Sequence, residues 1–157
     1  MRISFDLDDT LILSRRYADL PHSWGHKMLN REWLREGTVE LLHELQEFHE
    51  LWVYTSSNRP AWMIWLCFRL HGIRLKGIVN DARHRRDIRK YRKKLPRIPT
   101  KYPPMYKIDL HIDDAEGVAA EGRTCDFPVI QVEPGDSDWV FKVERQIDQH
   151  HAKVAQT

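Results

Sequence analysis

Residues 2–11 read RISFDLDDTL, a short apolar stretch that runs directly into three aspartates. Apolar side chains alternate with others over residues 2–7, which predicts a β-strand. Asp6 lies at the end of that strand, and Asp8 follows two residues later. A strand that ends in polar residues is typical of an α/β domain, where ligands bind beyond the carboxyl ends of parallel strands. This stretch therefore predicts both the fold class and the place of the functional site.

The rest of the chain alternates between strand and helix patterns. Further strands are predicted at residues 51–54, 73–79, 108–112 and 128–132. Helices are predicted from residue 38 to about 48, from 60 to about 70 and over 137–154, with Thr38 as the N-cap of the first. Alternating strands and helices form a parallel sheet with right-handed crossovers. We therefore expect an α/β fold, a Rossmann-like three-layer sandwich around a central parallel sheet of about five strands.

Length and composition are typical of one globular domain. The chain has 157 residues, of which 41% are hydrophobic and 31% charged, as in soluble folded proteins. The longest clean apolar run, residues 61–68, is far shorter than the ~20 residues of a membrane span, so no membrane partner is expected. Aspartates occupy the place where a signal peptide has its apolar core. Cys67 and Cys125 form neither a CxxC motif nor a disulfide framework. These features predict a cytoplasmic location.

Three of the predicted strands end in residues with side-chain oxygens. The first ends at Asp6, the second at Thr55, and the fourth at Asp113 and Asp114. Carboxylates gathered at one point repel one another and raise each other's pKa values. Mg²⁺ relieves this repulsion, because it prefers a few carboxylates together with waters and phosphate oxygens. The sequence therefore favours a magnesium site over a metal-free acidic cluster.

These motifs resemble those of the haloacid dehalogenase (HAD) superfamily. The stretch FDLDDTL at residues 5–11 is similar to the superfamily's first motif, residues 54–55 to its second, and residues 112–114 to its fourth. The three motifs stand in the expected order over roughly residues 1–133. An acid at the position of Asp8 is typical of the phosphatase-like branch. The resemblance implies a HAD-like fold with Mg²⁺ as the cofactor.

The resemblance also implies a role for each matching residue. Asp6 is similar to the nucleophile that forms an aspartyl-phosphate, and Asp8 to the acid/base that protonates the leaving oxygen and then activates water. Thr55 is similar to the hydroxyl residue that binds the transferring phosphoryl group. Further substrate contacts are expected from Ser56, Asn58 and Arg59. The implied metal ligands are Asp6, Asp8 through its main-chain carbonyl, Asp113 and Asp114, with Asp114 touching the metal directly.

The superfamily's third motif is a lysine that balances the charge of the nucleophile and the phosphate. Lys101, twelve residues before Asp113, is the favoured candidate. Lys93 and Lys94 have more typical spacing but lie within a basic run, and they remain alternatives. His111 shares a strand face with Asp113, and a hydrogen-bonded structural role is favoured for it over a role beside the metal.

The predicted organisation is a single HAD-like catalytic domain over residues 1–157. Only a short flap, about residues 11–35, and a basic insertion, about residues 81–104, interrupt the alternation of strands and helices. Neither is long enough for a full cap domain. In this superfamily, an open site of this kind goes with large substrates or with a cap lent by another subunit.

The basic insertion is the chain's most distinctive stretch. Between Arg83 and Lys101 lie ten Lys/Arg residues and one acid, Asp87, so this stretch carries +9 while the whole chain carries only +2. Such a run suggests a polyanionic partner, nucleic acid included, and a solvated surface is the alternative.

The sequence supports two hypotheses about the function of this protein. The first is a magnesium-dependent phosphomonoester hydrolase that works through an aspartyl-phosphate on Asp6, acting on a phosphorylated substrate that is large or polyanionic. The second is a non-catalytic phosphate- or nucleic-acid-binding module that retains the fold. The presence of every expected acid favours the enzyme.

Overall fold

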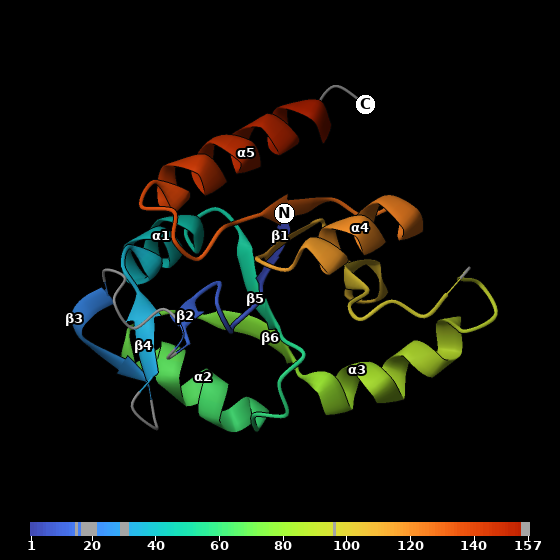
Figure 1. Ribbon diagram of the computed structural model, residues 1–157, viewed down its shortest axis with the longest axis horizontal. Coiled ribbons are helices and arrows are strands. Elements are labelled where there is room, and N and C mark those ends of the chain that lie inside the picture. Colours follow the sequence, from blue (N-terminus) through green and yellow to red (C-terminus); the bar gives the residue numbers. More distant parts are fainter. Residues whose placement is uncertain (15, 17–21, 29–31, 96, 155–157) are drawn as a thin grey trace.

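Five strands form one parallel sheet at the centre of the protein (Figure 1). The computed structural model describes residues 1–14, 16, 22–28, 32–95 and 97–154. The strands lie in the order β6-β5-β1-β7-β8, so β1 is the middle strand. Their bounds are β1 (Arg2–Phe5), β5 (Glu50–Tyr54), β6 (Leu75–Val79), β7 (Leu110–Asp113) and β8 (Val129–Gln131). The predicted central parallel sheet is confirmed.

Helices cover both faces of this sheet. They are α1 (Thr38–Leu45), α2 (Ala61–Leu70), α3 (Asp81–Asp87), α4 (Glu116–Cys125) and α5 (Trp139–Val154). One apolar cluster joins β1 to α1, α2 and α5, which places these helices on one face. Figure 1 shows α1 and α5 side by side, and the Trp139 indole donates to the Glu36 carbonyl between them. Because α3 and α4 pack on the other face, the fold is a three-layer α/β sandwich.

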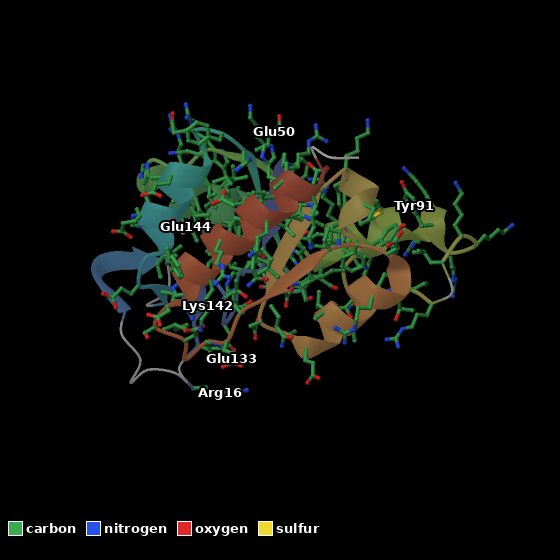
Figure 2. All side chains as sticks on the ribbon, turned by 90° about the horizontal axis from the view of Figure 1, so that it is seen from above. Arg16, Glu50, Tyr91, Glu133, Lys142 and Glu144 are labelled. Carbon is green, nitrogen blue, oxygen red and sulfur yellow. The ribbon has the colours of Figure 1, made fainter. Side chains whose placement is uncertain are left out.

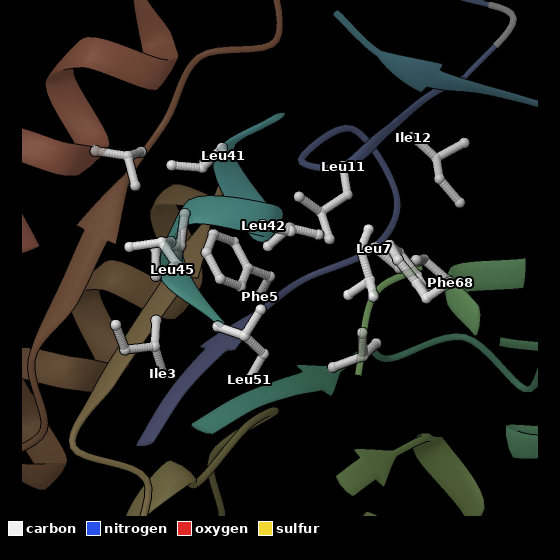
Figure 3. Packing of buried hydrophobic residues seen from close by; sticks show 14 of the residues in the cluster. Ile3, Phe5, Leu7, Leu11, Ile12, Leu41, Leu42, Leu45, Leu51 and Phe68 are labelled. Carbon is white, nitrogen blue, oxygen red and sulfur yellow. The ribbon is translucent and has the colours of Figure 1, made fainter. Parts of the chain in front are cut away.

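The first face of the sheet holds the main apolar core. Ile3 and Phe5 of β1 pack with Leu41 and Leu42 of α1 and with Phe68 of α2, all fully buried (Figure 3). Alternate side chains of a strand point to opposite faces, so the odd-numbered residues of β1 all contribute to this core. This burial is the main source of the fold's stability.

The second face of the sheet is polar where the first is apolar. Ser4 of β1, Tyr54 of β5 and His111 of β7 are all fully buried on it. Buried polar groups need hydrogen-bond partners, and these residues supply them to one another and to neighbouring loops. The predicted site residues Asp6, Thr55 and Asp113 stand at the carboxyl ends of these three strands.

The α1 helix begins differently from the prediction. Gly37, not Thr38, is its N-cap and adopts the left-handed conformation with φ of 79°. Thr38 lies inside the helix, and its hydroxyl donates to the Leu11 carbonyl instead of capping the helix. A left-handed residue at this point favours glycine, because a Cβ there would be strained.

A small antiparallel sheet follows the first motif. It contains β2 (Ile12–Leu13), β3 (His22–Met28) and β4 (Glu32–Arg35) in the order β2-β4-β3. These strands lie within the flap predicted at about residues 11–35. Of that flap, residues 15, 17–21 and 29–31 lie outside the described residues.

The predicted basic insertion, residues 81–104, contains α3 and the short 3₁₀ turn η2 (Ile88–Tyr91). A second turn, η3 (Pro103–Tyr106), leads into β7. Figure 1 shows this region and the small antiparallel sheet at opposite ends of the molecule's long axis. Among the described residues, no helix combines the length and apolar character that a membrane span requires.

Candidate active site

Asp6 and Lys101 form a buried ion pair at the end of the middle strand. Asp6 directly follows β1, and its main-chain N–H donates to the Ile112 carbonyl at 2.8 Å. Lys101 Nζ lies 2.7 Å from Asp6 Oδ1 and 2.6 Å from Asp113 Oδ2. The Lys101 side chain is only 2% exposed. Two carboxylates at neighbouring strand ends therefore share one ammonium group.

Lys101 reaches this position because its flanking residues are fixed. Thr100 donates to Glu121 of α4 through both its main-chain N–H, at 2.8 Å, and its hydroxyl, at 3.0 Å. The Tyr102 N–H donates to the Tyr54 hydroxyl at 2.8 Å. The two alternative lysines, Lys93 and Lys94, are exposed in the segment before it. Of the three candidates, the structure brings only Lys101 into contact with Asp6.

Both oxygens of Asp113 are occupied by protein donors. Oδ1 accepts from the Ala115 N–H at 2.9 Å, and Oδ2 accepts from His111 Nε2 at 2.8 Å as well as from Lys101. His111 Nδ1 lies 2.8 Å from Ser4 Oγ. Donation from Nε2 to the carboxylate leaves Nδ1 of a neutral ring as the acceptor of the Ser4 hydroxyl. This network fixes the orientation of the Asp113 side chain.

Asp114 has fewer partners and completes an acidic cluster. Its Oδ1 accepts one hydrogen bond of 3.2 Å from Thr10 Oγ1. Carboxylate oxygens of Asp6, Asp113 and Asp114 all lie within 4.8 Å of one another. Such a set of hard oxygen donors fits Mg²⁺, which takes one or two carboxylates and leaves positions for waters and phosphate oxygens. The Asp8 side chain is not part of this cluster.

The three carboxyl groups of this cluster have different pKa shifts. Burial raises the pKa of Asp6, opposed by the charge of Lys101. Burial also acts on Asp113, but the hydrogen bond from His111 and the charge of Lys101 outweigh it and lower its pKa. For Asp114, burial together with the charges of Asp113 and Asp6 raises the pKa to about 6. Repulsion among these acids is thus incompletely balanced by Lys101, and a divalent cation beside Asp114 would remove the remainder.

Asp8 pairs with a residue of the loop after β5. Arg59 Nη1 lies 2.6 Å from Asp8 Oδ1, and the Asp8 side chain is about half exposed. The structure thus brings together the predicted acid/base and one predicted substrate-binding residue. The Arg59 carbonyl also accepts from the Asn80 side chain at 3.0 Å, which helps to fix this loop.

The other residues of the second motif lie in a tight turn after β5. Thr55 is buried, and its hydroxyl accepts from the Ser57 N–H at 3.0 Å. Ser56 is exposed and lines the same cavity as Asp6. Asn58 is also exposed but does not line that cavity, so it is the predicted site residue least connected to the others.

A cavity of about 450 Å³ opens beside the ion pair, between the second motif and α4. Asp6, Ser56, Lys101 and Asp113 line it, as expected from the motifs. Its other polar lining residues, which were not among the predicted site residues, are Arg97, Thr100, Glu121 and Thr124. Arg97 stands within the basic run, and no local pattern distinguishes it there from its cationic neighbours.

Solved structures with a similar fold are HAD-type hydrolases. One is a HAD-superfamily hydrolase of subfamily IA, variant 1, from Geobacter sulfurreducens, with 14% identity and a TM-score of 0.50 over 83% of this chain and 88% of the other. Another is described as a predicted HAD-like family hydrolase from Porphyromonas gingivalis, with 13% identity and a TM-score of 0.53 over 93% of this chain and 97% of the other. No family model and no curated protein matches the chain. The comparisons show that the chain has the HAD-like fold, which confirms the fold implied by its motifs.

Proposed function

Starting from a HAD-like fold, we propose that this protein is a magnesium-dependent phosphomonoester hydrolase with Asp6 as its nucleophile. The observation that carries the proposal is the buried Asp6–Lys101–Asp113 contact beside Asp114 and an open cavity. A carboxylate nucleophile, a fixed positive charge and a set of metal-ligating oxygens then stand together at one edge of the sheet. Phosphoryl transfer requires mainly such positioning and charge neutralisation.

In the first step, a carboxylate oxygen of Asp6 attacks phosphorus. The bond from phosphorus to the leaving oxygen breaks, Asp8 donates a proton to that oxygen, and the alcohol departs. Asp6 then carries the phosphoryl group as an aspartyl-phosphate. Lys101 offsets the negative charge on Asp6 and on the incoming phosphate. The contact between Arg59 and Asp8 holds the side chain of this acid in place.

In the second step, water releases the phosphate. The Asp8 carboxylate takes a proton from a water molecule, whose oxygen attacks phosphorus as the bond to Asp6 breaks. Inorganic phosphate leaves, and Asp6 and Asp8 return to their starting states. Asp6, Asp113 and Asp114 would hold Mg²⁺, with the main-chain carbonyl of Asp8. When bound, Mg²⁺ supplies charge neutralisation for the phosphoryl oxygens.

Turnover of an aryl phosphate with and without Mg²⁺ tests this proposal. We expect Asp6→Asn to abolish turnover and to prevent trapping of a fluoroberyllate adduct, with the folded structure retained. Asp126→Asn is the matched control, because Asp126 caps α4 away from the cavity in a left-handed conformation that asparagine accepts. Turnover by the Asp6 variant at the wild-type rate would refute the nucleophile. Binding of phosphate by the wild-type protein with no turnover of any phosphomonoester would favour the non-catalytic module.

A further inference from the structure

Exposed cations are concentrated from the last residues of α3 to the loop before Lys101. This basic segment, residues 85–95 and 97, carries eight exposed cationic side chains: Arg85, Arg86, Arg89, Lys90, Arg92, Lys93, Lys94 and Arg97. Figure 2 shows Tyr91 at one end of the molecule, with nitrogen-tipped side chains projecting into solvent around it. The segment is thus a concentrated positive patch.

The acids near this patch already have cationic partners. Asp81 pairs with Arg85 at 2.7 Å, and Asp87 with Arg86 at 2.9 Å. Glu121 lies 3.5 Å from Arg97. The remaining five cations form no ion pair with any residue that the structure describes: Arg89, Lys90, Arg92, Lys93 and Lys94. Their charge is therefore available to an external anion.

The patch is fixed to the body of the protein at both ends. At its start, the buried ring of His84 contacts the Tyr54 hydroxyl through Nδ1 at 2.5 Å and the Pro99 carbonyl through Nε2 at 3.2 Å. Ile88 is buried in the η2 turn, and Asp87 accepts from the Tyr106 hydroxyl at 3.0 Å. A patch held in this way loses less conformational freedom on binding than a free tail would.

The patch is continuous with the candidate active site. Arg97 lines the same cavity as Asp6, and its side chain is 70% exposed. Thr100 and Lys101 follow within the same chain segment and also line that cavity. Arg97 thus connects the cavity to the patch, and the nearest unpaired cation, Lys94, stands three residues before it in the chain.

From this continuity we infer that the basic segment is a docking surface for nucleic acid, and that the strand's terminal phosphate enters the Asp6 cavity. The second half of the inference rests on the proposed phosphatase function. A nucleic acid combines the two features required: a phosphomonoester at its end and a chain of regularly spaced phosphodiester charges. A small phosphorylated metabolite carries too few negative charges to engage five unpaired cations.

Binding to a fluorescent single-stranded DNA 20-mer tests the surface independently of catalysis. We measure it by anisotropy with the full-length wild-type protein in EDTA at several salt concentrations. Released counterions should make the logarithm of the association constant fall linearly with the logarithm of salt concentration, at about −0.7 per phosphate contacted. A slope near zero in the wild-type protein would overturn the inference, whatever any variant does.

A charge-removal variant locates the surface. Changing four of the unpaired cations to Gln should weaken binding roughly tenfold or more at low salt and reduce the salt slope by about 2–3; these are Arg89, Arg92, Lys93 and Lys94. The matched control removes four exposed cations from other elements and should retain wild-type affinity; these are Arg69, Lys76, Arg123 and Arg145. Equal losses in the two variants would overturn the assignment of the surface.

The chemistry of the ligand is tested with three further probes. A 5′- or 3′-phosphorylated 20-mer should bind more tightly than the same strand with hydroxyl ends, since its terminal phosphate enters the cavity. Equal affinities would overturn that placement. Tighter binding to polyglutamate, or to vesicles containing phosphatidylserine, would overturn nucleic acid as the partner. If the wild-type protein binds DNA but does not turn over aryl phosphate, the phosphatase proposal is refuted and the docking surface is not.

Discussion

His111 and Asp113 are joined by a hydrogen bond of 2.8 Å on the polar face of β7, where both side chains are fully buried. The same imidazole contacts Ser4 of the middle strand at 2.8 Å. The orientation of Asp113 therefore depends on β1 as well as on its own strand. This link couples the stability of the sheet to the geometry of the acidic cluster.

We expect His111→Phe to lower the free energy of unfolding by roughly 1–3 kcal/mol, because it leaves buried polar groups without a partner. Chemical denaturation measures the change. Ser4→Ala should cost about 1 kcal/mol, and the double variant should show less than the sum of the two losses. Additive losses would mean that Ser4 and His111 act separately.

Asp113 and Asp114 should contribute differently to Mg²⁺ affinity. Protein donors occupy both Asp113 oxygens, whereas the side-chain donor to Asp114 among the described residues is the Thr10 hydroxyl, at 3.2 Å. We therefore expect Asp114→Asn to weaken Mg²⁺ binding more than Asp113→Asn does, as measured by calorimetry. Asp113→Asn should instead lower the free energy of unfolding more, since it removes one of the two buried carboxylates that pair with Lys101. The opposite ranking of affinities would exchange the roles of the two acids.

Lys101→Met should reduce aryl phosphate turnover roughly 10²–10³-fold, because it removes the positive charge between Asp6 and the incoming phosphate. It should also destabilise the fold, since two buried carboxylates lose their shared counter-ion. Steady-state kinetics and denaturation measure the two effects. Lys76→Met, at an exposed position of β6, serves as the control and should change neither. An active Lys101 variant would reassign the charge-balancing role.

The Asp8→Asn variant should distinguish leaving groups. With an alkyl phosphate, whose leaving oxygen needs a proton, turnover should fall roughly 10²–10⁴-fold. With an activated aryl phosphate the loss should be smaller. Asp9→Asn is the control, because the Asp9 backbone is in the left-handed conformation, which asparagine also adopts, and its carboxylate accepts from the Ser14 N–H. Equal losses on both substrates would mean that Asp8 does not protonate the leaving group and only shapes the metal site.

The strands and the acidic cluster were predictable because their signals are local. Each strand of the sheet is a short apolar run, and in parallel sheets the residues after such runs meet at one edge. Asp6, Asp113 and Asp114 follow this rule, so their proximity needed no knowledge of the loops. His111 was also placed on the face of Asp113 by the alternation of strand residues.

Other features depend on contacts that a single segment does not reveal. The α4 helix was not predicted, because its sequence, EGVAAEGRTC, has two glycines and weak apolar periodicity. One of them, Gly122, is required by packing, since a Cβ there would lie 2.7 Å from the Phe127 carbonyl oxygen. Likewise, Glu121 fixes Thr100 only because α4 docks beside the loop that carries Lys101.

The two halves of the site lie on opposite sides of the basic segment in the chain. Asp6, Asp8 and Thr55 precede that segment, whereas Lys101 and Asp113 follow it. The segment is exposed and rich in the Lys and Arg residues at which trypsin cleaves. After a single nick there, the pairing of β1 with β7, including Phe5 with Ile112, would hold the two fragments together. This protein is therefore a natural candidate for splitting at the basic segment, because Asp6 and its partner Lys101 would then come from different fragments.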